Sequence, residues 1–94
     1  MDIRFYNDPE TNQPHIYGHG VTEDEVGEVM RGPGEDFPAA NDSRMKLGQT
    51  MNGRYLQVIY VPDEDPTSVF VITAYELRGK AKKAYRRRQR RKPR

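Results

Sequence analysis

Two histidines stand four residues apart near the start of the chain, in the stretch HIYGHG. A His-x-x-x-His pair binds a metal ion when both rings project from one face of a helix. Here Pro14 comes directly before the pair and glycines flank the second histidine, so we predict no helix over residues 15–19. His15 is therefore expected in a loop, and His19 remains the candidate acid or base.

The other residue types argue against most further site chemistries. A second cluster of potential metal ligands, Asp63, Glu64 and Asp65, lacks the ligand spacing and the glycine of a calcium loop. The 94 residues include no cysteine, no phosphate-binding glycine loop and no serine in a nucleophile context. We therefore predict neither a metal nor a cofactor.

Charge is divided unequally along the chain. Residues 80–94 carry ten lysines and arginines and no acid, whereas residues 1–79 carry all fourteen acids and six bases. A basic block of this density predicts a polyanionic partner, which is RNA, DNA or an acidic protein. The alternatives are a solvated tail and a tail folded back on the acidic body. The expected RNA-binding residues are Lys46, Lys80, Lys82, Lys83, Arg86, Arg87, Arg88, Arg90 and Arg91.

Helix signals are strongest over residues 22–31. Thr22 and Glu25 have the spacing of a capping box, in which each side chain accepts a hydrogen bond from the other residue's backbone N–H. Val21 and Val26 are placed as a hydrophobic staple across the helix start, and the dipeptide Gly-Pro after residue 31 ends the helix.

A two-residue turn is predicted between the segments RMKLGQTM and RYLQVIYV, because Asn52-Gly53 is the typical sequence of a type I′ turn. This turn would set Leu47 opposite Val58 and direct both toward the core. Lys46 would then lie on the other face of the hairpin, together with tyrosine and glutamine side chains.

Further strands are predicted over residues 2–6 and 68–77, with a weaker one around residue 37, and a glycine at 79 opens a terminal helix. This order describes an α+β fold: a curled antiparallel sheet of three to five strands, an N-terminal helix and a basic C-terminal helix. Residues 1–79 form the predicted single domain, and 80–94 the basic helix or tail. Without an apolar run that could cross a membrane, a signal peptide or a cysteine, a cytoplasmic location and no membrane partner are expected.

Metal-independent RNA cleavage needs an acid or base, a cation on the phosphate and a surface that orients bases. Candidate groups come from the hairpin, the end of the last strand and the terminal helix. Each has a structural alternative, because strand tyrosines commonly pack and surface cations are commonly solvated. The candidate catalytic residues are His19, Arg54, Tyr75, Arg78 and Tyr85.

Two segments, HGVTEDEVGEVM at 19–30 and RMKLGQTMNGRYLQVIYVPDEDPTSVFVITAYELRGKAKKAYRR at 44–87, carry a resemblance to a known family. Together they resemble the BrnT family of bacterial toxins and, more closely, an uncharacterised sister group of small BrnT-like proteins. The resemblance implies a RelE-like fold and a metal-independent endoribonuclease that cuts free or ribosome-bound mRNA. It also implies a cognate antitoxin as partner.

Compared position by position, His19 falls on the histidine of the family's Lys-His-Gly-Val motif and Tyr85 on a tyrosine of its last helix. The chain departs from the family at three positions. Gly18 replaces the lysine of the motif, Tyr75 replaces a strand arginine, and Ala81 replaces a helix glutamate. Two hypotheses follow: an endoribonuclease toxin of a toxin–antitoxin pair, or a non-catalytic RNA- or protein-binding module of the same fold, which the departures favour.

Overall fold

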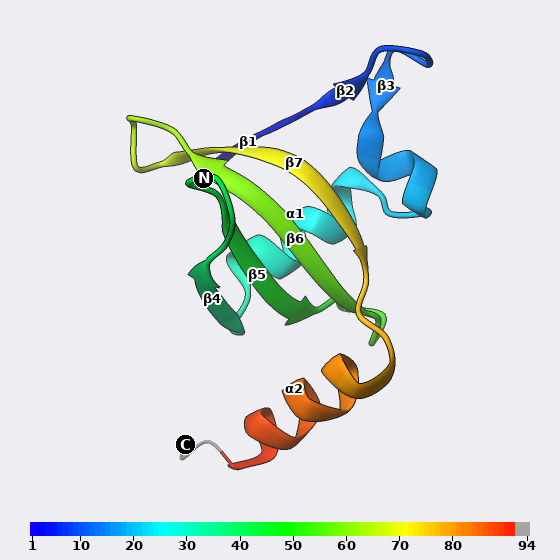
Figure 1. The fold of residues 1–94 in the computed structure, drawn as a ribbon, viewed down its shortest axis with the longest axis vertical. Helices are drawn as coiled ribbons and strands as arrows, with labels where there is room; N and C mark the ends of the chain where they lie inside the picture. The colour runs from blue at the N-terminus through cyan, green and yellow to red at the C-terminus, as the bar shows by residue number, and fades with distance from the viewer. Residues whose placement is uncertain (92–94) are drawn as a thin grey trace.

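A five-stranded mixed sheet organises the computed structural model, which describes residues 1–91 (Figure 1). The sheet order is β1-β7-β6-β5-β4, with β1 at Asp2–Phe5, β4 at Glu35–Pro38, β5 at Arg44–Gln49, β6 at Tyr55–Pro62 and β7 at Ser68–Glu76. The other elements are the short pair β2 (Asn7–Asp8) and β3 (Gln13–Pro14), the 3₁₀ helix η1 (His15–His19), α1 (Glu23–Arg31) and α2 (Gly79–Arg91). The fold is α+β, and the last three residues of the predicted 80–94 tail lie outside the described residues.

Helix α1 covers one face of the sheet and begins at the predicted capping box. The Thr22 hydroxyl accepts from the Glu25 N–H at 3.2 Å, and a Glu25 carboxylate oxygen accepts from the Thr22 N–H at 3.0 Å. Val21 and Val26 are both buried in the main core, where the apolar face of α1 packs on β5 and β6. Local sequence therefore explains both the start and the buried face of this helix.

Strand β1 runs parallel to β7, with Ile3 opposite Val69, so the prediction of an antiparallel sheet is wrong at this edge. Ile3 and Phe5 pack against the main core, as their alternation indicates. Alternation is the same in a parallel and an antiparallel strand, and the long connection between β1 and β7 permits either direction. Strand direction was therefore not encoded locally.

The hairpin of β5 and β6 forms, but its loop has three residues rather than two. The Thr50 N–H donates to the Arg54 carbonyl at 2.7 Å, and the Gly53 N–H donates to the Thr50 carbonyl at 2.9 Å. Gly53 has a φ of 88°, whereas Asn52 is not among the residues with positive φ. A type I′ turn needs positive φ at both central positions, so the predicted turn is wrong.

This longer loop shifts the register by one residue. Leu47 lies opposite Gln57, and Lys46 lies opposite Val58. A one-residue shift exchanges the two faces of a strand. Contrary to the prediction, Lys46 therefore lies on the face of α1, and Leu47 lies on the opposite face.

Another prediction that fails concerns residues 15–19, which form the 3₁₀ helix η1. Pro14 precedes its first residue, where a missing N–H costs no hydrogen bond. Gly20, with a φ of 71°, ends the helix after five residues. Ile16 of this helix is buried in the main core. The proline and the glycines thus limit η1 without preventing it.

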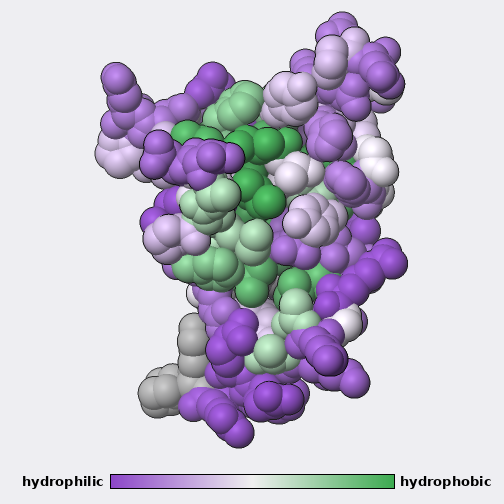
Figure 2. Space-filling view, in the orientation of Figure 1, coloured by the Kyte–Doolittle hydropathy of each residue, from purple (hydrophilic) through white to green (hydrophobic). Residues whose placement is uncertain are grey.

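The sheet face opposite α1 carries a second, smaller core of Leu47, Leu77 and Tyr85, formed where α2 lies against the end of the sheet (Figure 1). Figure 2 shows hydrophobic side chains in the middle of this face, beyond the cover of α2. A hollow of about 370 Å³ opens there beside Met45 and Ile59. Only one end of this face is therefore closed by a helix.

We expect Tyr60 to be the last tyrosine to ionise. Its phenol is buried and donates to Asp36; burial, and next this hydrogen bond, raise the pKa of Tyr60 to about 12. The folded state therefore holds the Tyr60 proton more tightly than the unfolded state does, and this difference stabilises the fold. The stabilisation is complete below pH 10 and is lost as the pH rises from about 10 to about 12. An alkaline absorbance titration should show a late step that Tyr60→Phe removes. Survival of that step in the variant would contradict the assignment.

Candidate nucleic-acid interface

The basic C-terminal segment forms helix α2. Gly79, with a φ of 61°, turns the chain out of β7, and the helix continues to Arg91. Its cations are exposed, apart from the half-buried Lys82. They are the RNA-binding residues predicted for the tail: Lys80, Lys82, Lys83, Arg86, Arg87, Arg88, Arg90 and Arg91.

Two contacts fix α2 to the body. Tyr85, 3% exposed, packs in the small core with Leu47 and Leu77. Arg88 donates two hydrogen bonds, of 2.6 and 2.7 Å, to the two carboxylate oxygens of Glu35. The candidate catalytic Tyr85 therefore anchors the helix, and the cation of Arg88 is held by an acid of β4.

One side of α2 concentrates positive charge. Lys83, Arg86, Arg87 and Arg90 line a hollow of about 180 Å³ on its surface. Like charges three or four residues apart destabilise a helix by about 0.2–0.5 kcal/mol per pair. A polyanion bound on this side would remove the repulsion and would therefore stabilise the helix.

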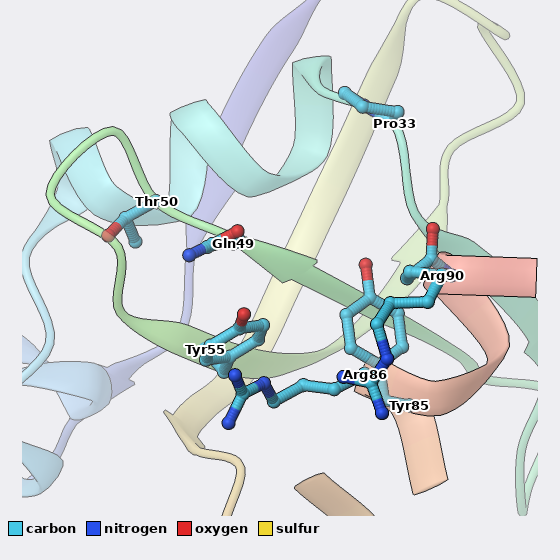
Figure 3. Close-up of a pocket in the computed structure, with 8 residues that line it drawn as sticks. Pro33, Gln49, Thr50, Tyr55, Tyr85, Arg86 and Arg90 are labelled. Carbon is cyan, nitrogen blue, oxygen red and sulfur yellow. The ribbon is translucent and has the colours of Figure 1, made fainter. Parts of the chain in front are cut away.

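A cavity of about 530 Å³ lies between α2 and the hairpin (Figure 3). The ring of Tyr55 stands edge-on to that of Tyr85, with centroids 6.1 Å apart. Lys82 Nζ and Arg86 Cζ lie 5.2 and 5.7 Å from the centroid of Tyr55, within cation–π range. The cavity is lined by Pro33, Gln49, Thr50, Tyr55, Tyr85, Arg86, Gln89 and Arg90.

Two of the candidate catalytic residues meet at a second place, beside η1. The ring of His19 lies 5.6 Å from that of Tyr75 and 5.3 Å from that of His15. His15 in turn lies 6.0 Å from the ring of Tyr6, and its Nδ1 is 3.5 Å from a carboxylate oxygen of Asp8. This cluster combines two imidazoles with phenols, and His19 is exposed.

Arg54, expected to bind phosphate, lies between two carboxylates. Its Nη1 donates to Glu25 at 3.0 Å and to the Gly20 carbonyl at 2.8 Å, and its Nε donates to Glu76 at 3.3 Å. Burial opposes the charge of Glu25, but hydrogen bonds from Thr22 and Arg54 outweigh it and hold the pKa of that carboxyl below its usual value. The structure therefore uses Arg54 to join η1, α1 and β7.

The other two cations predicted outside the tail, Arg78 and Lys46, lie in different places. Arg78 is exposed, with one guanidinium nitrogen 3.8 Å from Glu76. Lys46 Nζ donates to the Gly32 carbonyl at 2.9 Å, where it satisfies the C-terminal end of α1. The register shift thus places Lys46 away from the face of Tyr55 and gives it a structural contact.

The five candidate catalytic residues do not form a single site. His19 and Tyr75 are in contact, Arg54 and Arg78 both approach Glu76, and Tyr85 belongs to the small core. Sequence reasoning missed the amides that line the cavity, Gln49 and Gln89. The correct register would have located the first of them, since Gln49 pairs directly with Tyr55.

Among residues 1–91, no three His, Cys, Asp or Glu side chains gather to hold a metal ion. In the same range, no helix is long and apolar enough to cross a membrane. Comparison with protein-family models, with curated proteins and with solved structures finds no match to this chain. The BrnT resemblance therefore stays a prediction.

Replacing Arg54 with methionine should reduce stability and leave nucleic-acid affinity unchanged. The variant leaves Glu25 and Glu76 without their shared cation, which we expect to cost about 1–3 kcal/mol in the free energy of unfolding. Urea denaturation measures the first effect and a binding titration with RNA the second. Arg78→Met, which removes a guanidinium that is 79% exposed, is the control with little change in stability. If the Arg54→Met protein were as stable as the wild type but bound RNA more weakly, Arg54 would be a contact to RNA rather than a structural residue.

Proposed function

We propose that this protein binds RNA through helix α2 and the adjoining surface of the hairpin. The observation that carries the proposal is a row of exposed cations on a helix that Tyr85 and Arg88 hold in place beside a tyrosine-lined cavity. Phosphates supply the negative charge that this row attracts, and the half-buried ring of Tyr55 supplies a platform on which a base can stack.

RNA fits this surface better than an acidic protein does. A carboxylate partner would satisfy the cations but would leave the rings and amides of the cavity without a matching group. RNA presents unpaired bases together with its phosphates, which is the combination that sequence-specific RNA-binding surfaces recognise. The resemblance to BrnT-type proteins supports the same choice.

Two substitutions on the charged side of α2 test the proposal. Lys83→Gln with Arg87→Gln should weaken binding to RNA about tenfold at low salt and reduce the slope of log Kd against log salt by about 1.4, because each lost phosphate contact removes about 0.7. Arg4→Gln with Arg31→Gln removes two charges from the body and is the matched control. An equal loss in both double variants would show that net charge, rather than α2, determines binding.

RNA cleavage is a second candidate function, favoured by the contact between His19 and Tyr75. A neutral imidazole could take the proton of a 2′-hydroxyl while the 2′-oxygen attacks phosphorus. The bond to the 5′-oxygen breaks, and that oxygen takes up a proton from water. The products would be a 2′,3′-cyclic phosphate and a 5′-hydroxyl, and the chemistry needs a cation on the phosphate. Arg54 is compensated by Glu25 and Glu76, so the geometry favours binding without cleavage.

We expect RNA in complex with the purified protein to remain intact, because Arg54, which donates to the carbonyl of Gly20 next to His19, is already paired with Glu25. Gel analysis of the RNA, and mapping of new 5′ ends after induction in a bacterial host, measure this outcome. His19→Gln is the control variant. New 5′-hydroxyl ends that appear with the wild type and are absent with His19→Gln would show that the protein cleaves RNA, and would contradict the proposal of binding alone.

A further inference from the structure

The cavity between α2 and the hairpin has the properties of a nucleotide site rather than of a charged surface alone. Resting on the proposed binding of RNA by α2, we infer that this cavity receives the base of one unpaired nucleotide, with the neighbouring phosphates on Arg86 and Arg90. The protein then selects single-stranded over double-stranded RNA.

The size of the cavity suits such a ligand. Its volume of about 530 Å³ lies within the range of about 300–1,000 Å³ that is usual for small-molecule sites. Gln49, Thr50 and Tyr55, where β5 ends and β6 begins, form one wall, and α2 forms the other (Figure 3). Since Tyr85 and the Arg88–Glu35 pair hold α2, the two walls are kept apart at a fixed spacing.

Groups inside the cavity match the faces and edges of a base. The half-buried ring of Tyr55 is an aromatic platform that a base can occupy when it displaces the neighbouring cations of Lys82 and Arg86. Base–aromatic stacking requires no particular base. Gln49 donates its amide N–H to the Gly53 carbonyl at 3.2 Å, and its amide oxygen lies on the side away from the hairpin turn (Figure 3). That oxygen can accept from an amino group on a base edge.

The rim of the cavity matches a phosphate backbone. Arg86 and Arg90 stand four residues apart on α2, so their side chains project from one face of the helix. Figure 3 shows the guanidinium of Arg86 reaching the ring of Tyr55. None of the described residues that line the cavity is acidic. A phosphate bound to Arg86 therefore brings its base next to Tyr55.

Only an unpaired base can enter. In a duplex each base is stacked and paired inside the helix, and its extraction costs a few kcal/mol. A duplex can still bind the exposed cations of α2 through its phosphates, without sequence or base contacts. The cavity thus adds affinity for a single strand that a duplex cannot gain.

The experiment uses a set of short single-stranded RNAs that each carry 2-aminopurine at a different position. The binding of each RNA is compared with that of the same RNA annealed to its complement. We expect the single strand to bind about tenfold more tightly, and the fluorescence of one 2-aminopurine position to be quenched by stacking. Tyr55→Leu should remove the quenching and reduce the single-strand affinity to that of the duplex. Gln49→Ala, at an exposed position that cannot disturb the core, should weaken only the single strand, by about threefold.

Met51→Ala is the matched control, because Met51 is 86% exposed on the same hairpin loop and does not line the cavity. It should bind both RNAs as the wild type does. No binding of either RNA would mean that the proposed function is wrong. Equal binding of the two RNAs, without quenching at any position, would overturn the nucleotide site and leave RNA binding by α2 intact.

Discussion

The register of the β5–β6 hairpin is the constraint on which both faces of the sheet depend. Gly53 permits a three-residue loop, which sets Lys46 and Gly48 opposite Val58 and Leu56 on the face of α1. A Cβ on Gly48 would come within 2.9 Å of Val29, so the absent side chain lets the helix approach. Lys46 then reaches the end of that helix. One turn residue thus decides how α1 packs.

The same register prepares the candidate interface on the opposite face. It directs Leu47 into the core that holds Tyr85, and it places Gln49 directly beside Tyr55. Because α2 is already anchored by burial and by the Arg88–Glu35 pair, its helical backbone is positioned before any ligand arrives. Binding groups that are ordered in advance lose less conformational entropy on association.

Ion pairs explain why the charge of α2 stays available. In the body, Arg54 is shared by Glu25 and Glu76, and Arg44 is paired with Asp36. Within residues 1–91, the salt bridge of α2 to the body joins Arg88 to an acid of β4. Arg88 is therefore a cation of α2 that folds back on the acidic body, as one of the alternatives for the tail predicted. The charged side around Arg86 and Arg90 faces solvent.

Local patterns predicted what local interactions determine. The capping box at Thr22, the strands and the basic helix follow from residues close together in sequence, and they gave the fold class. The direction of β1, the hairpin register and η1 depend on distant partners or on a single backbone angle, so local sequence patterns could not specify them. The exposed cations of α2 in the candidate interface could be found from the sequence, because charge density is visible there. The cavity was not, because Gln49 and Tyr55 face it only in the observed register. The part of the surface that could distinguish RNA from any other polyanion is thus the part that depends on the tertiary fold.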